Sequence, residues 1–301
     1  MKILLTGKDG QVGFELVRAL APLGEVVAVG RADCDLADAG ALRALVRRVA
    51  PDVIVNPAAW TAVDRAESGR EAAFAVNARA PGILGEEGAR LGALVVHYST
   101  DYVFDGAGLA PYKESDRPAP QSVYGSSKLA GERALAEACP RHLILRTSWV
   151  LGAHGGNFAK TMLRLAAERE QLRVVDDQFG APTPAALLAD LTAHLVRQHA
   201  REGREAFPYG TYHVAAAGET SWYDYARFVL EAARSAGKLL RAGPDEVLPV
   251  HTADFPTAAR RPANSRLDTS LFRHTFGLCL PPWQDGVRHV LRHLLRSEND
   301  A

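Results

Sequence analysis

The chain has few cysteines, few lysines and no long apolar run. Cys34, Cys139 and Cys279 are isolated, odd in number and without metal-ligand spacing, which argues against a disulfide scaffold and a cysteine zinc site. No apolar stretch approaches the ~18 residues that a membrane-spanning helix needs. The N-terminus opens on a strand-like run and leaves no room for a secretory leader. We expect a soluble, cytoplasmic protein with thiols in a reducing compartment and no membrane partner.

An excess of charge of either sign is also lacking. The 301 residues contain 35 basic and 35 acidic side chains, and no basic run stands out. A nucleic-acid partner is therefore not expected, because such partners select clustered positive charge. Only six of the basic residues are lysine, so a lysine in a meaningful position is less easily accidental.

Alternating apolar runs and helical stretches fill the first half of the chain. The runs expected to be strands are Lys2–Thr6, Glu25–Val29, Asp52–Asn56, Ala93–Tyr98 and His142–Thr147. Repeated β-α units of this kind predict an α/β fold, a Rossmann-type doubly wound parallel sheet with right-handed crossovers. Ligands of such sheets bind beyond the carboxyl ends of the strands.

The length predicts one main domain and a smaller lobe. We assign residues 1–150 to a dinucleotide-binding domain that also receives about 185–216, where Gly210–Ala215 has the pattern of a strand. Residues 151–301 are assigned mainly to a discontinuous, substrate-binding lobe. Its expected helices are Asn157–Arg169, Trp222–Ala233 and Trp283–Leu295.

A glycine turn follows the first predicted strand. Gly7, Gly10 and Gly13 are spaced three apart, followed by the helical pattern of Phe14–Leu20. The first glycine permits a tight exit from the strand, the second lets a pyrophosphate approach the backbone, and the third lets the helix pack near the sheet. The helix N-terminus adds free N–H groups and a positive dipole end. The arrangement predicts a phosphate-binding loop for a dinucleotide.

The end of the second predicted strand bears on the choice of cofactor. NAD-selective sites usually place an acid there for the ribose 2′-hydroxyl, whereas this chain has Gly30 and Arg31. A guanidinium suits a 2′-phosphate and favours NADPH. Asp33 and Asp35 stand close by and could hold the ribose of NADH instead.

Tyr124 and Lys128 form the proton-handling half of the predicted site. Four residues apart on a helix, they share one face. A nearby cation stabilises phenolate, so we expect Lys128 to draw the pKa of Tyr124 toward neutrality and make Tyr124 an acid for a carbonyl oxygen. Thr100 lies in a second polar segment, Ser99-Thr100-Asp101, at the end of a strand. The alternative is a surface Tyr and Lys that share a helix by chance.

With these motifs placed, the chain resembles the extended short-chain dehydrogenase/reductase superfamily, and within it the dTDP-4-dehydrorhamnose reductases. The likeness runs through nearly the whole chain. Its most specific stretches are Gly7–Gly13, His97–Phe104, Arg146–Val150, Asn157–Met162, Asp177–Thr183 and Arg260–Ser265.

The resemblance implies NADPH-dependent reduction of dTDP-6-deoxy-L-lyxo-4-hexulose at C4 to dTDP-β-L-rhamnose, a step of polysaccharide precursor synthesis. It implies a proton from Tyr124, with Lys128 holding the nicotinamide ribose and Thr100 the reacting oxygen. The implied cofactor contacts are Gly7, Gly10, Gln11, Val12, Gly13, Arg31, Asp35, Leu36, Ala59, Trp60, Thr61, Tyr98, Tyr124 and Lys128. The implied substrate contacts are Thr100, Asp101, Trp149, Arg261 and Asn264. Trp149 could instead be a core aromatic, and Arg261 and Asn264 could be solvated.

Two departures and two rival functions stay open. Members of this family often carry an acid near Gly30 and accept NADH. Some dimerise through Mg²⁺ held by glutamates; Glu15 matches one such position, but Ala186 stands at the second. A homodimer is possible, and a magnesium bridge within it is doubtful. The rivals are a reductase or epimerase of another nucleotide sugar, and a non-catalytic NADP-binding subunit similar to that of methionine adenosyltransferase.

Overall fold

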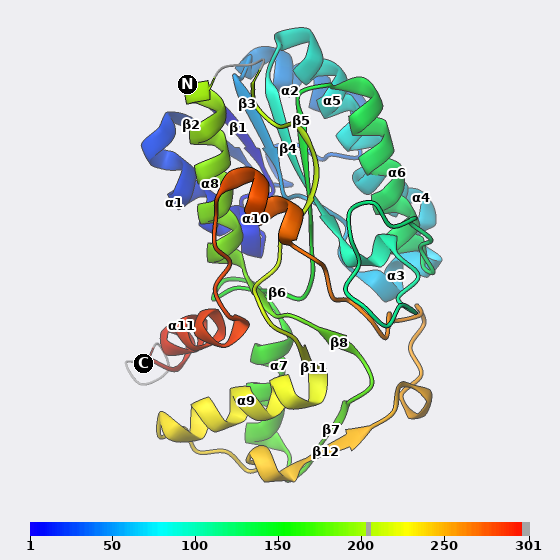
Figure 1. Ribbon diagram of the computed structural model, residues 1–301, viewed down its shortest axis with the longest axis vertical. Helices are drawn as coiled ribbons and strands as arrows, with labels where there is room; N and C mark the ends of the chain where they lie inside the picture. The colour runs from blue at the N-terminus through cyan, green and yellow to red at the C-terminus, as the bar shows by residue number, and fades with distance from the viewer. Residues whose placement is uncertain (203–205, 297–301) are drawn as a thin grey trace.

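A computed structural model describes residues 1–202 and 206–296 and shows a six-stranded sheet. The strand order is β10-β5-β4-β3-β1-β2, and all neighbours run parallel. The strands are β1 (Lys2–Thr6), β2 (Glu25–Val29), β3 (Val53–Asn56), β4 (Leu94–Thr100), β5 (His142–Thr147) and β10 (Gly210–His213). Helices cover both faces, so the predicted doubly wound parallel sheet is confirmed (Figure 1).

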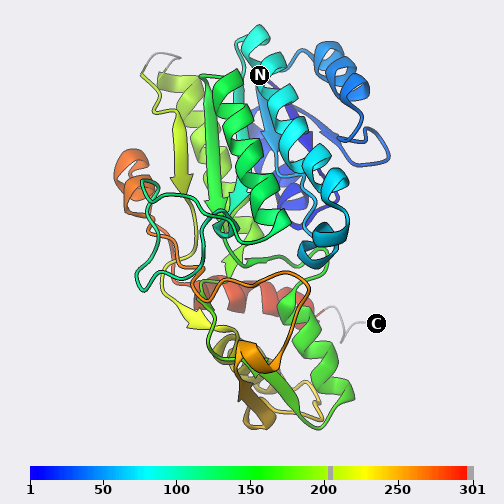
Figure 2. The same cartoon turned by 90° about the vertical axis from the view of Figure 1, so that its right-hand side faces the viewer.

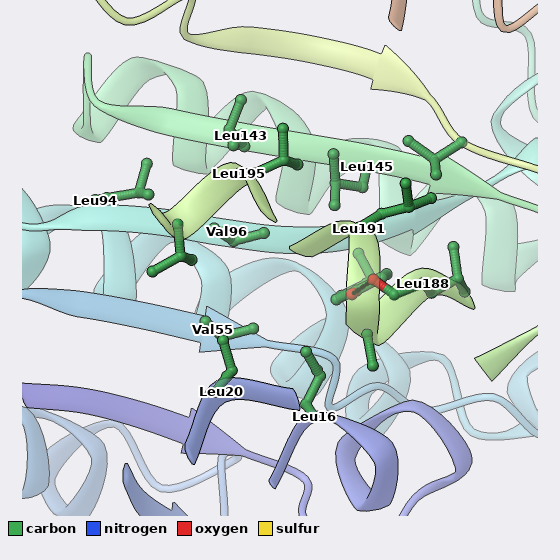
Figure 3. Close-up of a cluster of buried hydrophobic side chains, with 14 of the residues drawn as sticks. Leu16, Leu20, Val55, Leu94, Val96, Leu143, Leu145, Leu188, Leu191 and Leu195 are labelled. Atoms are coloured by element: carbon green, nitrogen blue, oxygen red, sulfur yellow. Dashed lines mark hydrogen bonds between the residues drawn. The ribbon is translucent and has the colours of Figure 1, made fainter. Parts of the chain in front are cut away.

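Each face of the sheet has its own apolar core. Ile3 and Leu5 pack on one face, whereas Leu4, between them, packs on the other, as the strand period of two requires. The first face is covered by α1 (Gln11–Leu20) and α8 (Ala185–Glu202), whose leucines meet the strands in Figure 3. On the opposite face lie α2 (Ala39–Val49), α5 (Ala80–Leu91) and α6 (Val123–Ala138).

The smaller lobe lies below the carboxyl ends of the strands (Figures 1 and 2). It consists of α7 (Phe158–Glu168), α9 (Trp222–Ser235) and α11 (Trp283–Arg296), with β7 (Leu172–Val175) paired to β12 (Val247–Val250). These elements enclose a separate apolar cluster that includes Tyr225 and Trp283. The lobe thus has an apolar core of its own, separate from those on the two faces of the sheet.

The chain passes between sheet and lobe more than once. After α7, the helix α8 and the strand β10 return to the sheet. Near the C-terminus α10 (Ser270–Phe276) also returns, and its Phe276 ring lies 4.9 Å from that of Tyr212 on β10. The late segment 270–276 therefore packs on the sheet, although the sequence pattern did not single it out.

Short elements complete the described chain. They are α3 (Val63–Ser68), α4 (Arg70–Phe74), a π-helical turn (Ala75–Arg79), β6 (Val150–Leu151), β8 (Phe179–Gly180), β9 (Thr183–Pro184), β11 (Thr220–Ser221) and the 3-10 turns Ala21–Leu23, Asp101–Val103, Pro244–Glu246 and Thr252–Asp254. Within residues 1–202 and 206–296, every helix is too short or too polar to cross a bilayer.

Candidate active site

A cleft of about 770 Å³ opens at the carboxyl edge of the sheet, where it faces the lobe. The glycine turn, the ends of the strands, the first turns of α6 and the tryptophans of the lobe line it. Most of the predicted residues meet here: Gly7, Gly10, Gln11, Val12, Gly13, Arg31, Asp35, Leu36, Ala59, Trp60, Thr61, Tyr98, Thr100, Asp101, Tyr124, Lys128 and Trp149. Segments remote in sequence converge because the strands are parallel and share one carboxyl edge.

The glycine turn has the geometry of a phosphate cradle. Gly7 adopts φ +64°, and a Cβ at Gly13 would lie 1.9 Å from the carbonyl oxygen of Gly7. No described side chain caps the start of α1 at Gly10, so its first N–H groups face the cleft without a side-chain acceptor. Such N–H groups suit an anion. The turn therefore fits the pyrophosphate of a dinucleotide.

Two cations flank the end of β2. The Lys8 Nζ lies 2.6 Å from Asp33 Oδ2, and the same carboxylate oxygen accepts a hydrogen bond from the Gly30 N–H at 2.8 Å. Arg31 lines the cleft with 83% of its side chain exposed, 3.8 Å from Asp35. Asp33 is thus engaged by protein groups, whereas the Arg31 guanidinium can turn toward a phosphate.

Tyr124 sits in the first turn of α6, which Ser122 caps by accepting a hydrogen bond from the Gly125 N–H at 3.1 Å. Burial of its hydroxyl raises the pKa of Tyr124 to about 12, although the neighbouring Thr100 hydroxyl opposes the rise. Tyr102 packs edge-on against the Tyr124 ring at 5.4 Å. Tyr124 is therefore fully protonated in the neutral range.

Lys128 is aimed at strand β4. Its Nζ donates to the Tyr98 carbonyl at 2.6 Å and lies 3.2 Å from His97 Nε2. Burial lowers the pKa of Lys128 to about 8. The prediction that Lys128 draws the pKa of Tyr124 toward neutrality is wrong for this structure, because shielding from water governs the phenol.

Asp101 is a buried carboxyl beside Thr100. The Thr100 hydroxyl donates to Asp101 Oδ1 at 3.0 Å. Burial raises the pKa of Asp101 to about 6, against hydrogen bonds from Ser265 and Thr100. Its negative charge in turn contributes to the raised pKa of Tyr124. Thr100 and Asp101 at the end of β4 therefore lie beside Tyr124 on α6, and the charge of Asp101 affects the protonation of Tyr124.

Three buried hydroxyls also line the cleft, and the sequence argument had placed only Ser99 at this edge of the sheet. The oxygens of Ser99, Thr147 and Ser148 are without a hydrogen-bond partner in the described part of the chain. Buried polar groups are normally satisfied, so these three point to a polar ligand. Their sequence signals were a position at the end of a predicted strand and a place in the stretches His97–Phe104 and Arg146–Val150, which carry the family resemblance.

A pair of tryptophans closes the lobe side of the cleft. Trp149 stacks on Trp222 with ring centroids 3.6 Å apart and an interplanar angle of 15°. Trp149 has φ +48°, a left-handed conformation, and a Cβ at Gly180 would lie 2.6 Å from its indole. The packing holds the indole at the cleft, so Trp149 is more than a core aromatic. Trp222 was expected only as the start of a helix.

Known proteins are similar to this chain over nearly its whole length. The family model described as "RmlD substrate binding domain" matches residues 1–296. The dTDP-4-dehydrorhamnose reductase of Escherichia coli K12 is 53% identical over 301 residues, 99% of each chain. The chain belongs to the dTDP-4-dehydrorhamnose reductase family.

Solved structures of this family superpose closely. A dTDP-4-dehydrorhamnose reductase from Clostridium acetobutylicum has a TM-score of 0.89 at 34% identity, over 98% of this chain and 99% of its own. The enzyme from Bacillus anthracis, solved in complex with NADP, has a TM-score of 0.88 at 34% identity, over 97% and 99%.

Two residues that the family resemblance implied lie elsewhere. Arg261 and Asn264 are not among the described residues that line the cleft. Arg261 pairs with Asp64 on α3. The Asn264 amide donates to the carbonyls of Gly108 and Ala110, both at 2.8 Å. Asn264 therefore ties one loop to another, and its polar atoms are used within the protein.

The implied magnesium position of the family holds an ion pair. Arg18 lies 3.5 Å from Glu15 and 2.9 Å from Asp190, so its guanidinium sits between the two carboxylates. Across residues 1–202 and 206–296, no group of three or more His, Cys, Asp and Glu side chains is placed to hold a metal ion.

Proposed function

We propose that the protein reduces dTDP-6-deoxy-L-lyxo-4-hexulose at C4 to dTDP-β-L-rhamnose, with NADPH as the reductant. The observation that carries the proposal is that Thr100, Tyr124 and Lys128 line the same cleft as the glycine turn. Membership of the dTDP-4-dehydrorhamnose reductase family supports the choice of substrate.

Tyr124 is the proton donor. When bound in the cleft, NADPH would supply the hydride for the ketone carbon. Tyr124, with a pKa of about 12, keeps its proton until the ketone oxygen becomes an alkoxide, which is a stronger base. Thr100 is placed to hydrogen-bond the same oxygen and stabilise its developing charge. The raised pKa suits an acid in the reductive direction.

The remaining residues bind and orient the two ligands. Gly7 to Gly13 would cradle the pyrophosphate of the cofactor, Ala59 to Thr61 and Tyr98 would line its path, and Lys128 would hold the nicotinamide ribose. Ser99, Thr147 and Ser148 satisfy hydroxyl groups of the sugar, since their oxygens lack partners in the described structure. The Trp149–Trp222 pair packs on an apolar sugar face.

The cofactor preference is tested at Arg31. NADPH should give a higher kcat/KM than NADH. Arg31→Ala should reduce the ratio of these two kcat/KM values by raising the KM for NADPH alone. Asp35 lies 3.8 Å from Arg31 and is the group that would serve the NADH ribose. A wild-type preference for NADH would overturn the role given to Arg31.

The substrate is tested by NADPH oxidation with the purified protein. Oxidation should require the 4-keto-6-deoxy dTDP-sugar. Turnover of a GDP- or ADP-linked ketone in its place would identify a different nucleotide-sugar enzyme. NADPH binding with no turnover of any such ketone would identify a regulatory subunit.

We place this reaction in the cytoplasm, where nucleotide sugars are made, with no nucleic-acid partner. A homodimer that needs no Mg²⁺ is the proposed assembly, because Arg18 already pairs with both Glu15 and Asp190.

A further inference from the structure

A row of four buried polar side chains crosses the sheet beneath the cleft. Thr6 ends β1, Asn56 ends β3 and His97 lies on β4; each is 0% exposed, and Lys128 is 2% exposed. Asn56 and His97 are register partners on neighbouring strands. Residues two positions earlier, Leu4, Ile54 and Val95, pack on the face covered by α2 and α5. The row therefore lies on that face, toward the helix that carries Lys128.

The four side chains form a continuous hydrogen-bonded chain. Thr6 Oγ1 lies 2.6 Å from Asn56 Oδ1, and Asn56 Nδ2 lies 3.0 Å from His97 Nδ1. His97 Nε2 lies 3.2 Å from Lys128 Nζ. Burial of polar groups is costly unless each finds a partner, and here each is the partner of the next.

Lys128 uses two of its three possible N–H bonds on β4. One goes to the Tyr98 carbonyl and the other is directed at His97. The third is left for the cleft, which Lys128 lines. His97 thus sets the direction in which the amine meets a ligand.

The chain has two self-consistent directions. In one, Thr6 donates to Asn56, Asn56 donates to Nδ1 of His97, and the Nε2–H of His97 donates to Lys128, which must be the uncharged amine. In the other, the Lys128 ammonium donates to Nε2, and the Nδ1–H donates to an Asn56 amide turned to present its oxygen. The amide NH₂ then donates to the Thr6 hydroxyl oxygen, and the Thr6 proton turns to the cleft, which Thr6 lines. Neutral imidazole carries one proton, so each direction requires a different tautomer.

We propose that His97 is a positioning residue for Lys128: by exchanging tautomers without changing charge, it holds the Lys128 amine in one place in both of its protonation states. The structural part of this inference is independent of the substrate. Its catalytic consequence depends on the function proposed above.

The electrostatics of the row agree with this role. Burial, helped by the Lys128 charge, holds the pKa of His97 well below its ordinary value, whereas burial lowers the pKa of Lys128 to about 8. The charged group acting on Lys128 from α6 is Glu132, itself bound by Arg146. The facing phenols are Tyr124 on α6 and Tyr98 on β4, and the Tyr98 hydroxyl bonds to Thr192. In the pH range in which Lys128 changes charge, His97 therefore stays neutral.

The tautomer of His97 can be measured directly on the whole wild-type chain without ligands. We expect ¹⁵N NMR of the histidine rings to show His97 neutral from pH 6 to pH 10, with its proton on Nδ1 below about pH 8 and on Nε2 above. His213 is the internal control: it is also buried, and its Nδ1 faces the Tyr112 carbonyl at 2.9 Å, so its tautomer should not change. A fixed tautomer or an imidazolium at His97 would overturn the proposal.

Kinetics of two amide variants separate positioning from packing. In His97→Gln the amide reaches as far as Nε2 and keeps a contact with Lys128, whereas in His97→Asn it reaches only as far as Nδ1. We expect His97→Asn to lower kcat/KM roughly 10–100-fold, as for loss of a hydrogen bond to a charged group, and His97→Gln to restore most of it. The alkaline limb of the pH profile should move to lower pH in His97→Asn only, because the ammonium loses an acceptor.

His213→Gln is the matched control for a buried histidine on the sheet and should keep the wild-type pH profile. Equal kcat/KM in the two His97 variants and the wild type, after correction for the folded fraction, would overturn the proposal. If neither variant folds, the tautomer measurement decides. Absence of any reductase activity would contradict the proposed function and leave that measurement intact.

Discussion

At the scale of single residues, the proposed proton donor is Tyr124, whose buried hydroxyl keeps its proton in the neutral range. Tyr124→Phe removes the proton and keeps the ring. We expect kcat to fall by about 10²–10⁴, the usual worth of a general acid, with the Kd for NADPH little changed. Single-turnover NADPH oxidation measures the rate of the chemical step, and a fluorescence titration measures the Kd for NADPH. Tyr112→Phe, outside the cleft, is the control; near-normal kcat in Tyr124→Phe would remove Tyr124 from the mechanism.

A second residue, Asp101, makes the stability of the fold depend on pH. Its pKa of about 6 in the folded protein exceeds the ordinary 3.8, so the folded state favours the protonated acid. Ionisation therefore costs stability, a cost that is absent below pH 3.8 and complete above pH 6. Asp101→Asn should have equal stability to wild type near pH 4 and be more stable by about 2–3 kcal/mol at pH 7. Urea unfolding at both values checks this; a difference that is the same at both would contradict it.

At the scale of elements, α2 is tied to α5 by one buried carboxylate. Glu87 accepts from Arg47 at 2.6 Å, from Arg43 at 3.2 Å and from Arg90 at 3.0 Å. The hydrogen bond from Arg47, more than the other arginines, lowers the pKa of Glu87 to about 2 against the effect of burial. A lowered pKa stabilises the fold above the unfolded value of 4.5 and loses that effect as the pH falls toward 2.

Glu87→Gln should therefore lower the free energy of unfolding by about 1–3 kcal/mol at pH 7, and by less at pH 3. This range allows for the screening of the partly exposed arginines by solvent. Chemical denaturation at the two pH values gives both free energies. The neighbouring Glu86, exposed and paired with Arg43, is the control: Glu86→Gln should stay within about 0.5 kcal/mol of wild type. An equal loss in the two variants would refute the role of the buried pair.

At the scale of the whole molecule, the carboxylates on the surface of α1 and α8 are already paired with an arginine. Arg18 lies between Glu15 and Asp190, and a divalent cation there would meet a guanidinium at close range. We expect EDTA to leave the sedimentation coefficient and the Tm unchanged, and Mg²⁺ to restore nothing. A change of mass on chelation would show that a metal holds the assembly together.

The sheet and the phosphate turn were predictable because their signals are local. Five apolar runs with helical stretches between them, and glycines three apart after the first run, require no knowledge of distant contacts. Arg31, Tyr124 and Lys128 followed, since each lies at the end of a predicted strand or on the next helix. The carboxyl-edge rule then brought them into one cleft.

The environment of these residues was not predictable in the same way. Lys128 bonds to His97 and the Tyr98 carbonyl, Arg261 pairs with Asp64, and Trp149 stacks on Trp222. Each partner comes from another element, so no spacing in the sequence announces it. The pKa of Tyr124 was mispredicted for this reason: its value depends on water exclusion by the whole cleft, and the helix spacing reports only one neighbour.

The sequence alone therefore determined the alternation of the main strands and helices, the phosphate turn and a candidate tyrosine at the cleft, because periodicity and glycine placement act over a few residues. Only the tertiary structure decided which hydroxyls lack partners, that Asn264 is used between loops, and that a buried histidine contacts the lysine. Those outcomes depend on desolvation and on partners far apart in the chain, which come together only once the sheet and the lobe have packed.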